Sequence, residues 1–245
     1  MRRAGRIVAE VLELVGSELK PGVSTAHLDA VAERHIRRQG GTPSFKGYRA
    51  SMGRGAYPAS VCISIDDEVV HGIPGDREIR AGQVVSIDAG AVVDGWHGDG
   101  ARTFIVGDAP QPLRDFVDST RRAMLAGIAA AVPGNHVGDI GAAIEDVAVP
   151  LGYGLVRQFV GHGIGKALHE PPQVPNFRSP DRGPELRPGV CLAIEPMLTM
   201  GGPEVVLGLD GWTVLTKDGS LAAHFEHTIV VTDGPAEILT AVQAR

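Results

Sequence analysis

A short stretch rich in aspartate and glycine, residues 88–99, constrains the fold of this chain more than any other part of it. It reads Asp-Ala-Gly-Ala-Val-Val-Asp-Gly-Trp-His-Gly-Asp, and its Asp94-Gly95 pair between β-prone segments predicts a two-residue hairpin turn. If these two residues form the turn, Val93 pairs with Trp96. Each residue before Val93 then pairs with the residue that lies equally far after Trp96. The turn alone therefore predicts the register of the strand pair.

This register brings two acidic side chains onto one face of the hairpin. Asp99 lies opposite Gly90, and Asp88 lies two residues from Gly90 on the same strand. Because side chains alternate between faces with a period of two, the carboxylates are diagonal neighbours, with Cα atoms roughly 7–8 Å apart. Gly90 has no side chain, which leaves room between them. Two acids on an apolar strand pair repel each other unless a positive charge lies between them, so we predict a cation site.

The composition is that of an ordinary globular protein. With 245 residues and 43% hydrophobic content, the chain can bury a substantial core as one large domain or two small ones. Its net charge of −6 argues against a nucleic-acid-binding protein. Cys62 and Cys191 are too few for a disulfide scaffold. Glu10 and Glu13 interrupt the apolar pattern near the N-terminus, so we expect no signal peptide and no membrane span, and a cytoplasmic location.

An arrangement of two helices followed by strands occurs twice along the chain. Helical periodicity covers two segments before residue 41 and two more between residues 111 and 152, and strand-like segments follow each pair. The segment from Arg80 to Asp88 also matches the segment from Arg187 to Glu195, with arginine, glycine, isoleucine and a terminal acid at equal spacing. We therefore predict an α+β domain of two related halves, in which Glu195 corresponds to Asp88.

Two further segments carry residues capable of chemistry. The segment from Gly161 to Glu170 contains His162 and His169, and its glycines favour a loop that approaches a ligand closely over a helix. Glu226 stands at the start of an apolar strand-like segment, where an acid is unusual.

These acids and one histidine together favour a pair of divalent metal ions. The four carboxylates of Asp88, Asp99, Glu195 and Glu226 carry a charge of −4, which two divalent cations balance. Carboxylates with one imidazole suit manganese, iron, cobalt or zinc better than they suit a structural zinc site. Two such ions about 3.5–4 Å apart can bridge a hydroxide and polarise a carbonyl, as in aminopeptidases.

Each candidate residue also has a structural interpretation. Acids beside a hairpin are usually solvated surface charges, although that explanation must here hold for four acids beside apolar strands. His71 and His169 are alternatively structural histidines with satisfied hydrogen bonds. Tyr57 and Trp212 are of a type that belongs to a core more often than to a pocket. Cys62 is expected to be buried rather than reactive.

Five ordered motifs, which together span nearly the whole chain, closely resemble those of the type I methionine aminopeptidases. They are His71-Gly-Ile-Pro, the Asp88…Asp99 pair, Gly161-His-Gly-Ile-Gly with Leu-His169-Glu, Ile194-Glu195-Pro-Met, and Glu226-His-Thr-Ile-Val-Val. The resemblance implies one catalytic domain over residues 1–245 with the pita-bread fold. In that fold two pseudo-symmetric αβ halves, here roughly residues 1–108 and 109–245, curve an antiparallel sheet around a dinuclear metal site.

The resemblance also implies roles for individual residues. The implied metal ligands, of which Asp99 and Glu226 bridge the two ions, are Asp88, Asp99, His162, Glu195 and Glu226. Glu195 also handles the proton of the attacking water, while His71 and His169 contact the substrate and stabilise the tetrahedral intermediate. The residues implied to line the methionine pocket are Tyr57, Cys62 and Trp212. Leu168 replaces an aromatic residue of many relatives, and the loop 48–57 is unusual.

The activity implied by the resemblance is removal of the initiator methionine from nascent proteins whose second residue is small. A metal-bridged hydroxide attacks the scissile carbonyl, and the cofactors are two divalent ions of cobalt, manganese, iron or zinc. The implied partners are nascent polypeptide N-termini, with transient ribosome association, no direct nucleic-acid contact and no membrane, and we expect a monomer. Two alternatives stay open. One is an Xaa-Pro aminopeptidase or dipeptidase of the same fold, which usually carries an extra N-terminal domain, and the other is a non-catalytic binding protein that kept the fold.

Overall fold

The protein is built on one large antiparallel sheet, seen in a computed structural model that describes residues 1–49 and 55–241. Residues 50–54 of the unusual loop lie outside the described residues. The main strand order is β1-β4-β5-β14-β9-β7-β8, with β2 paired to β4 and β15 paired to β14. The four central strands are β4 (Val84–Val93), β5 (Trp96–Ile105), β14 (Glu226–Val230) and β9 (Cys191–Ile194).

Shorter strands extend this sheet and form two small ones. The remaining strands of the large sheet are β1 (Thr42–Pro43), β2 (Val61–Ile65), β7 (Gly161–Gly163), β8 (Glu170–Val174) and β15 (Glu237–Ile238). One small sheet has the order β13 (Ala222–His224), β10 (Met197–Thr199), β6 (Gly154–Leu155). The other has the order β11 (Val205–Leu207), β12 (Val214–Thr216), β3 (Glu68–Val70).

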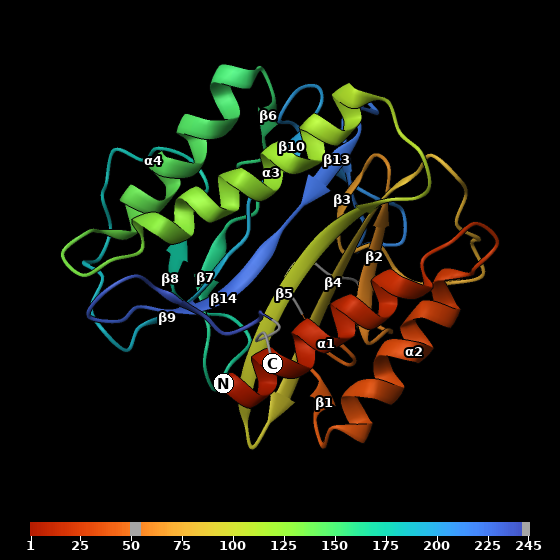
Figure 1. Cartoon of the computed structure of the whole chain (residues 1–245), viewed down its shortest axis with the longest axis horizontal. Coiled ribbons are helices and arrows are strands. Elements are labelled where there is room, and N and C mark those ends of the chain that lie inside the picture. Colours follow the sequence, from red (N-terminus) through yellow and green to blue (C-terminus); the bar gives the residue numbers. More distant parts are fainter. Residues whose placement is uncertain (50–54, 242–245) are drawn as a thin grey trace.

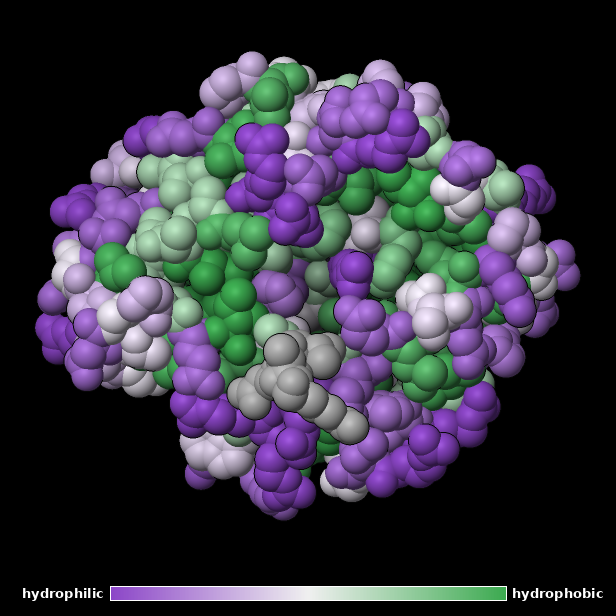
Figure 2. Space-filling view, in the orientation of Figure 1, coloured by the Kyte–Doolittle hydropathy of each residue, from purple (hydrophilic) through white to green (hydrophobic). Residues whose placement is uncertain are grey.

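Two pairs of helices cover one face of the large sheet, with β5 and β14 running between them (Figure 1). They are α1 (Arg2–Glu18) with α2 (Thr25–Arg38), and α3 (Gln111–Ala130) with α4 (Val137–Ala148) followed by the 3₁₀ turn η1 (Val149–Leu151). Apolar and hydrophilic residues are interspersed over this face, which is hollowed between the helix pairs (Figure 2). No helix within the described ranges is long and apolar enough to span a membrane.

The predicted hairpin register is confirmed. Strands β4 and β5 pair Val93 with Trp96 and Gly90 with Asp99. Asp94 and Gly95 both have positive φ, at 52° and 77°, which is the backbone geometry that an Asp-Gly hairpin turn adopts. Asp88 and Asp99 therefore emerge on the same face, as the sequence predicts.

Each helix pair packs its own core against its own part of the sheet. In the first part, Leu28 of α2 and Val8 of α1 are fully buried in a cluster with Ile87 of β4. In the second, Phe116 of α3 joins a separate cluster with Leu192 of β9. The central strand order β4-β5-β14-β9 places the hairpin of the first part beside two strands of the second, which brings their acids together.

Close approach of α1 to β5 depends on glycine. A Cβ atom on Gly98 would lie 2.7 Å from the backbone nitrogen of Gly5 in α1, nearer than real Cβ contacts come. Because the nearest atoms all belong to the backbone of Ala4 and Gly5, the contact cannot be relieved by moving a side chain. The absence of a side chain at Gly98 thus lets the first helix pack directly on the strand that carries Asp99.

We expect Gly98→Ala to lower the free energy of unfolding by about 1–3 kcal/mol, because it overpacks the α1–β5 contact. Urea unfolding monitored by circular dichroism measures the change. Gly75→Ala is the matched control, since a Cβ atom at Gly75 would have no neighbour within 4 Å and its φ is not positive, and its effect should stay below about 1 kcal/mol. Equal stability of Gly98→Ala and wild type would contradict the close packing.

Candidate metal centre

Four acidic side chains meet at the four central strands of the sheet. Asp88 lies on β4, Asp99 on β5 and Glu226 at the start of β14, while Glu195 directly follows β9. Asp99 and Glu226 are almost fully buried, at 4% and 2% exposure. Asp88 on β4 and Glu195 at the end of β9 lie on either side of the two inner strands, β5 and β14, that carry Asp99 and Glu226. This placement agrees with the predicted correspondence of Glu195 with Asp88.

His162 joins these acids from β7, which pairs with β9. Ligand atoms of Asp99, His162 and Glu226 all lie within 4.8 Å of one another. The Nε2 atom of His162 is also 3.4 Å from Oε1 of Glu195. The segment after Gly161 was predicted to be a loop and instead begins as strand β7, because its glycines let the backbone lie against Ala193 of β9.

The pKa values of these groups reflect how strongly burial and mutual repulsion disfavour the ionised carboxylates. Burial raises the pKa of Asp88, Glu195 and Glu226 well above the usual range, and the charges of the neighbouring carboxylates raise it further. Burial likewise raises the pKa of Asp99 to about 7. Burial, followed by the proximity of His169, lowers the pKa of His162 to about 4, so its imidazole is neutral.

Two carboxylate oxygens of the cluster have no hydrogen-bond partner within the part of the chain that the structure describes. Among the described residues, Oδ1 of Asp88 and Oε1 of Glu226 are buried without one. Unpaired buried polar atoms are costly, and carboxylate oxygens with one neutral imidazole nitrogen are ligands that divalent transition metals prefer. The donor set therefore fits bound divalent cations.

Neighbouring groups hold the backbone of the cluster in place. The Thr228 hydroxyl accepts a hydrogen bond from the Asp99 backbone N–H and donates one to the Asp99 carbonyl, at 2.9 and 2.7 Å. The Gly100 backbone N–H donates to Oδ1 of Asp99. The Asn176 side-chain amide donates to the backbone carbonyl of Glu195. These contacts orient the ligands much as outer-shell partners do in metal sites.

His224 is a buried residue of the site that the sequence did not single out. It is 2% exposed, its Nε2 atom has no hydrogen-bond partner among the described residues, and that atom lies 3.9 Å from Oε2 of Glu195. Its position two residues before Glu226, where strand alternation favours the same face, was the available signal.

The cluster opens onto a cavity of 490 Å³. All the residues that the sequence predicts for the site line this cavity: Asp88, Asp99, His162, Glu195, Glu226, His71, His169, Tyr57, Cys62 and Trp212. Other lining residues include Phe45, Tyr48, Phe159 and Leu168. Metal-binding groups therefore share one space with aromatic and aliphatic side chains.

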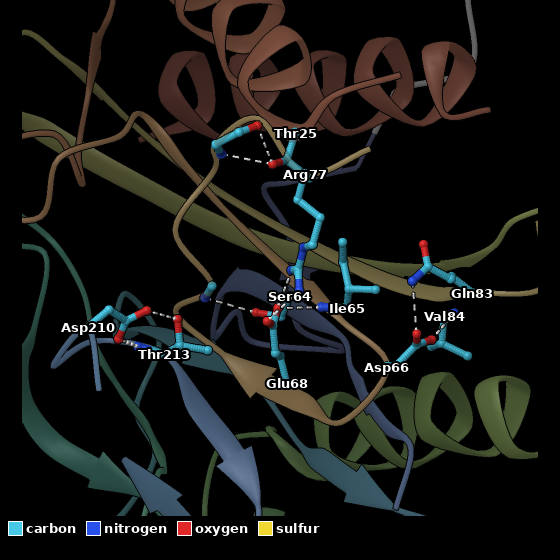
Figure 3. Close-up of polar contacts among 12 residues, drawn as sticks. Thr25, Ser64, Ile65, Asp66, Glu68, Arg77, Gln83, Val84, Asp210 and Thr213 are labelled. Atoms are coloured by element: carbon cyan, nitrogen blue, oxygen red, sulfur yellow. Dashed lines mark hydrogen bonds and ion pairs between the residues drawn. The ribbon is translucent and has the colours of Figure 1, made fainter. Parts of the chain in front are cut away.

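One wall of the cavity consists of aromatic residues with fixed orientations. The rings of Tyr57 and Trp212 meet edge to face, with centroids 5.1 Å apart. Asp210 accepts hydrogen bonds from the backbone N–H groups of Trp212 and Thr213 and from the Thr213 hydroxyl, and Figure 3 shows the Asp210–Thr213 contact. This turn holds the Trp212 ring against the cavity.

Burial raises the pKa of the Cys62 thiol, so Cys62 stays protonated, as expected for a buried cysteine.

Hydrogen bonds to neighbouring residues hold the loop that carries His71. His71 has a φ of 63°, in the left-handed region. The next backbone N–H, of Gly72, donates to the Ser64 hydroxyl at 3.1 Å. Nearby, Glu68 accepts two hydrogen bonds from Arg77, at 2.8 and 2.7 Å (Figure 3). A strained backbone that is held on several sides is typical of residues with a function.

His169 lies beside His162 at the exposed end of the cavity. Their ring centroids are 4.2 Å apart. The Nδ1 atom of His162 is 2.9 Å from the backbone carbonyl of Gly163, whereas the Nδ1 atom of His169 is 2.8 Å from the phenol oxygen of Tyr48. Tyr48 is the second residue of the site that the sequence did not single out.

Comparison with known proteins shows the family to which this chain belongs. The family model of metallopeptidase family M24 matches residues 1–233. The chain is 46% identical over 241 residues to a methionine aminopeptidase of Clostridium acetobutylicum, which covers 98% of this chain and 94% of that protein. It is 48% identical over 247 residues to methionine aminopeptidase 1 of Mycobacterium tuberculosis, covering 98% and 91%. The chain belongs to the methionine aminopeptidases of family M24.

The crystal structure of a methionine aminopeptidase from Thermotoga maritima is similar over 99% of this chain and 95% of that one, with a TM-score of 0.94 and 40% identity. The predicted family and the α+β pita-bread fold with two pseudo-symmetric halves are thus confirmed, and the chain is a metal-dependent aminopeptidase by family. A prolidase from Pyrococcus furiosus is similar at a TM-score of 0.75 but only 20% identical, and the chain covers 63% of it. That likeness concerns the fold alone.

We expect ionisation of the buried carboxylates to destabilise the metal-free protein as pH rises. Asp99 has a pKa of about 7 in the folded chain against an ordinary value of 3.8, so the folded state binds more protons than the unfolded state between these values. The stability that Asp99 contributes should therefore be fully present below about pH 4 and be lost as pH rises toward about 7, and Asp88, Glu195 and Glu226 act in the same direction. Buried histidines such as His162, whose pKa is lowered to about 4, act in the opposite direction.

Urea unfolding in EDTA at several pH values, with and without added Mn²⁺, measures this dependence. The cation should stabilise the protein most at the high-pH end. The Asp99→Asn variant, which cannot ionise at this position, isolates the contribution of Asp99, because the buried histidines are present in both proteins. Relative to this variant, the wild type should lose stability as pH rises from about 4 to about 7. A difference between the two free energies of unfolding that does not change over this pH range would contradict the assignment.

Proposed function

We propose that this chain removes the initiator methionine from nascent proteins whose second residue is small. The observation that carries the proposal is the shared cavity, in which the acids and histidine of the cluster face a wall that contains Tyr57, Cys62 and Trp212. Such a space can hold an apolar N-terminal side chain and at the same time present the first peptide bond to bound metal. Membership of the methionine aminopeptidases supports the same substrate.

The proposed ligands of two divalent ions are Asp88, Asp99, His162, Glu195 and Glu226, with Asp99 and Glu226 shared between the ions. Asp99 and Glu226 lie on the adjacent central strands β5 and β14, which suits shared ligands. Cobalt, manganese, iron and zinc all fit carboxylates with one imidazole. When bound, the ions supply activated water and polarise the scissile carbonyl.

The protein side chains position the substrate and move the proton. We assign Glu195 to accept the proton of the attacking water, because its carboxylate borders both His162 and His224 and has a raised pKa. His71 and His169 line the same cavity and would donate hydrogen bonds to the carbonyl oxygen as it gains negative charge.

The proposed methionine pocket is apolar and polarisable. Tyr57, Cys62 and Trp212 are 3%, 4% and 6% exposed and belong to one apolar cluster that also contains Leu168. Aromatic rings and a thiol contact a thioether favourably. Leu168 is smaller than an aromatic ring, and it contributes an aliphatic rather than a flat surface to this cluster.

The proposal extends to the setting of the enzyme. We infer a cytoplasmic monomer with a single catalytic domain over residues 1–245 and pseudo-repeats at roughly 1–108 and 109–245. It acts on nascent polypeptide N-termini and associates transiently with the ribosome, without direct contact with nucleic acid or membranes. The net charge of −6 agrees with the absence of a nucleic-acid partner.

Peptide hydrolysis distinguishes this activity from the alternatives. We expect protein reconstituted with Co²⁺ or Mn²⁺ to release methionine from Met-Ala-Ser and to leave intact Xaa-Pro peptides whose first residue is not methionine, because the apolar pocket selects the first side chain. Mass spectrometry of the products measures both reactions. Preference for Xaa-Pro peptides would favour the peptidases that share the fold, and no turnover with any divalent metal would favour a binding protein.

A single substitution tests the shared ligand. Outer-shell changes in metal sites typically cost 10–100-fold in affinity or activity, so we expect Asp99→Asn to lower kcat/KM by more than about 100-fold and to bind fewer than two metal ions. Isothermal titration calorimetry and metal analysis measure the binding. The control is Asp94→Asn, a change at the exposed turn of the same hairpin, which should retain both. Retention of two tightly bound ions by Asp99→Asn would rule out the bridging role.

A further inference from the structure

Two neighbouring histidines of the cavity differ in the hydrogen-bonding group that contacts their Nδ1 atoms. His162 and His169 lie with ring centroids 4.2 Å apart. A neutral imidazole has one N–H donor and one bare nitrogen, and the hydrogen bond at one nitrogen decides the state of the other. The two Nδ1 partners therefore determine what each ring presents to the cavity.

At His162 the partner is a backbone carbonyl, which can only accept. The Nδ1–H of His162 donates to the Gly163 carbonyl at 2.9 Å. Its Nε2 atom is then bare, 3.4 Å from a Glu195 oxygen, and is suited to a metal ion.

At His169 the partner is a phenol, which can donate. The Tyr48 oxygen lies 2.8 Å from Nδ1 of His169, and the two rings are in contact, with centroids 5.3 Å apart. This is the one hydrogen bond that the Tyr48 phenol makes with the chain over residues 1–49 and 55–241. If the phenol donates, Nδ1 is the acceptor and Nε2 carries the proton.

We propose that Tyr48 is a positioning residue that donates its phenol proton to Nδ1 of His169 and so holds His169 in the Nε2–H tautomer. The inference rests on the proposed function, in which His169 contacts the scissile carbonyl. A bare Nε2 would repel a carbonyl oxygen that becomes negative, whereas an Nε2–H donates to it. The two neighbouring histidines are thus held in opposite tautomers, one for metal and one for substrate.

The backbone around Tyr48 is anchored well enough for this role. The Tyr48 N–H donates to the Phe45 carbonyl, and the Tyr57 N–H donates to the Tyr48 carbonyl, both at 2.8 Å. Phe45 and Tyr57 themselves line the cavity. Tyr48 is therefore tied to the proposed methionine pocket, and its phenol links that pocket to the histidine at its mouth.

Tyr48→Phe removes the donor and keeps the ring. Loss of an entire oxyanion donor costs about 10²–10³ in kcat. Because His169 remains and still adopts the productive tautomer part of the time, we expect a fall in kcat of about 10-fold, with KM and metal content near wild type. The control is Tyr153→Phe, the same change on a half-buried ring that packs on Phe116, which should leave kcat unchanged.

The tautomers themselves can be observed by ¹⁵N NMR of the histidine rings in zinc-loaded protein. We expect His169 protonated on Nε2 and His162 protonated on Nδ1 in the wild type, and a mixed pattern for His169 alone in Tyr48→Phe. Wild-type His169 protonated on Nδ1 would overturn the inference.

His169→Ala separates this inference from the proposed function. If wild type releases methionine and His169→Ala lowers kcat but Tyr48→Phe does not, Tyr48 has no positioning role and the proposed function stands. If wild type releases no methionine, the proposed function itself fails. Adding Tyr48→Phe to His169→Ala should cause no further loss, because both act through one ring. An additional loss in the double variant would contradict action through His169.

Discussion

Mutual repulsion among four buried carboxylates is the constraint on which the rest of this structure depends. Burial raises the pKa of each one, and the neighbouring charges raise most of them further. A fold that brings such groups together is stable in their ionised form only if a positive charge lies among them. Among the described residues, Oδ1 of Asp88 and Oε1 of Glu226 have no hydrogen-bond partner, which leaves them free to contact such a charge. Divalent cations would supply this charge, and the proposed chemistry depends on them rather than on any single side chain.

The sheet supplies the precision that this cluster requires. The order β4-β5-β14-β9 sets the four acids on neighbouring strands, and the helix pairs pack two separate cores behind them. Gly98 lets α1 lie directly on the strand of Asp99, and the Thr228 hydroxyl joins that strand to β14. The same strand therefore serves packing and the candidate metal centre: Gly98 on one face permits close packing of α1, and Asp99 on the other face is a proposed metal ligand.

The fold alone does not decide the substrate. A prolidase from Pyrococcus furiosus has the same fold at 20% identity, so specificity must lie in the walls of the cavity. Here the wall combines the Tyr57–Trp212 pair, held by the Asp210 turn, with Leu168. The contact between Tyr48 and His169 joins this wall to the reacting centre. In the proposed function, recognition of the first side chain and orientation of His169 would thus depend on connected hydrogen bonds.

Local patterns in the sequence determined the hairpin and its register, because an Asp-Gly turn and a period of two leave few alternatives over so short a distance. The repeated Arg…Gly…Ile…acid pattern indicated that Glu195 corresponds to Asp88, and the ordered motifs indicated the family. The tertiary structure alone decided which groups touch between segments that are distant in the sequence. His224 beside Glu195, and Tyr48 at His169, 121 residues away, belong to segments whose local patterns do not encode the contact. Such pairs arise only when distant segments pack together, since turn geometry and strand alternation act within one element and do not determine contacts with distant ones.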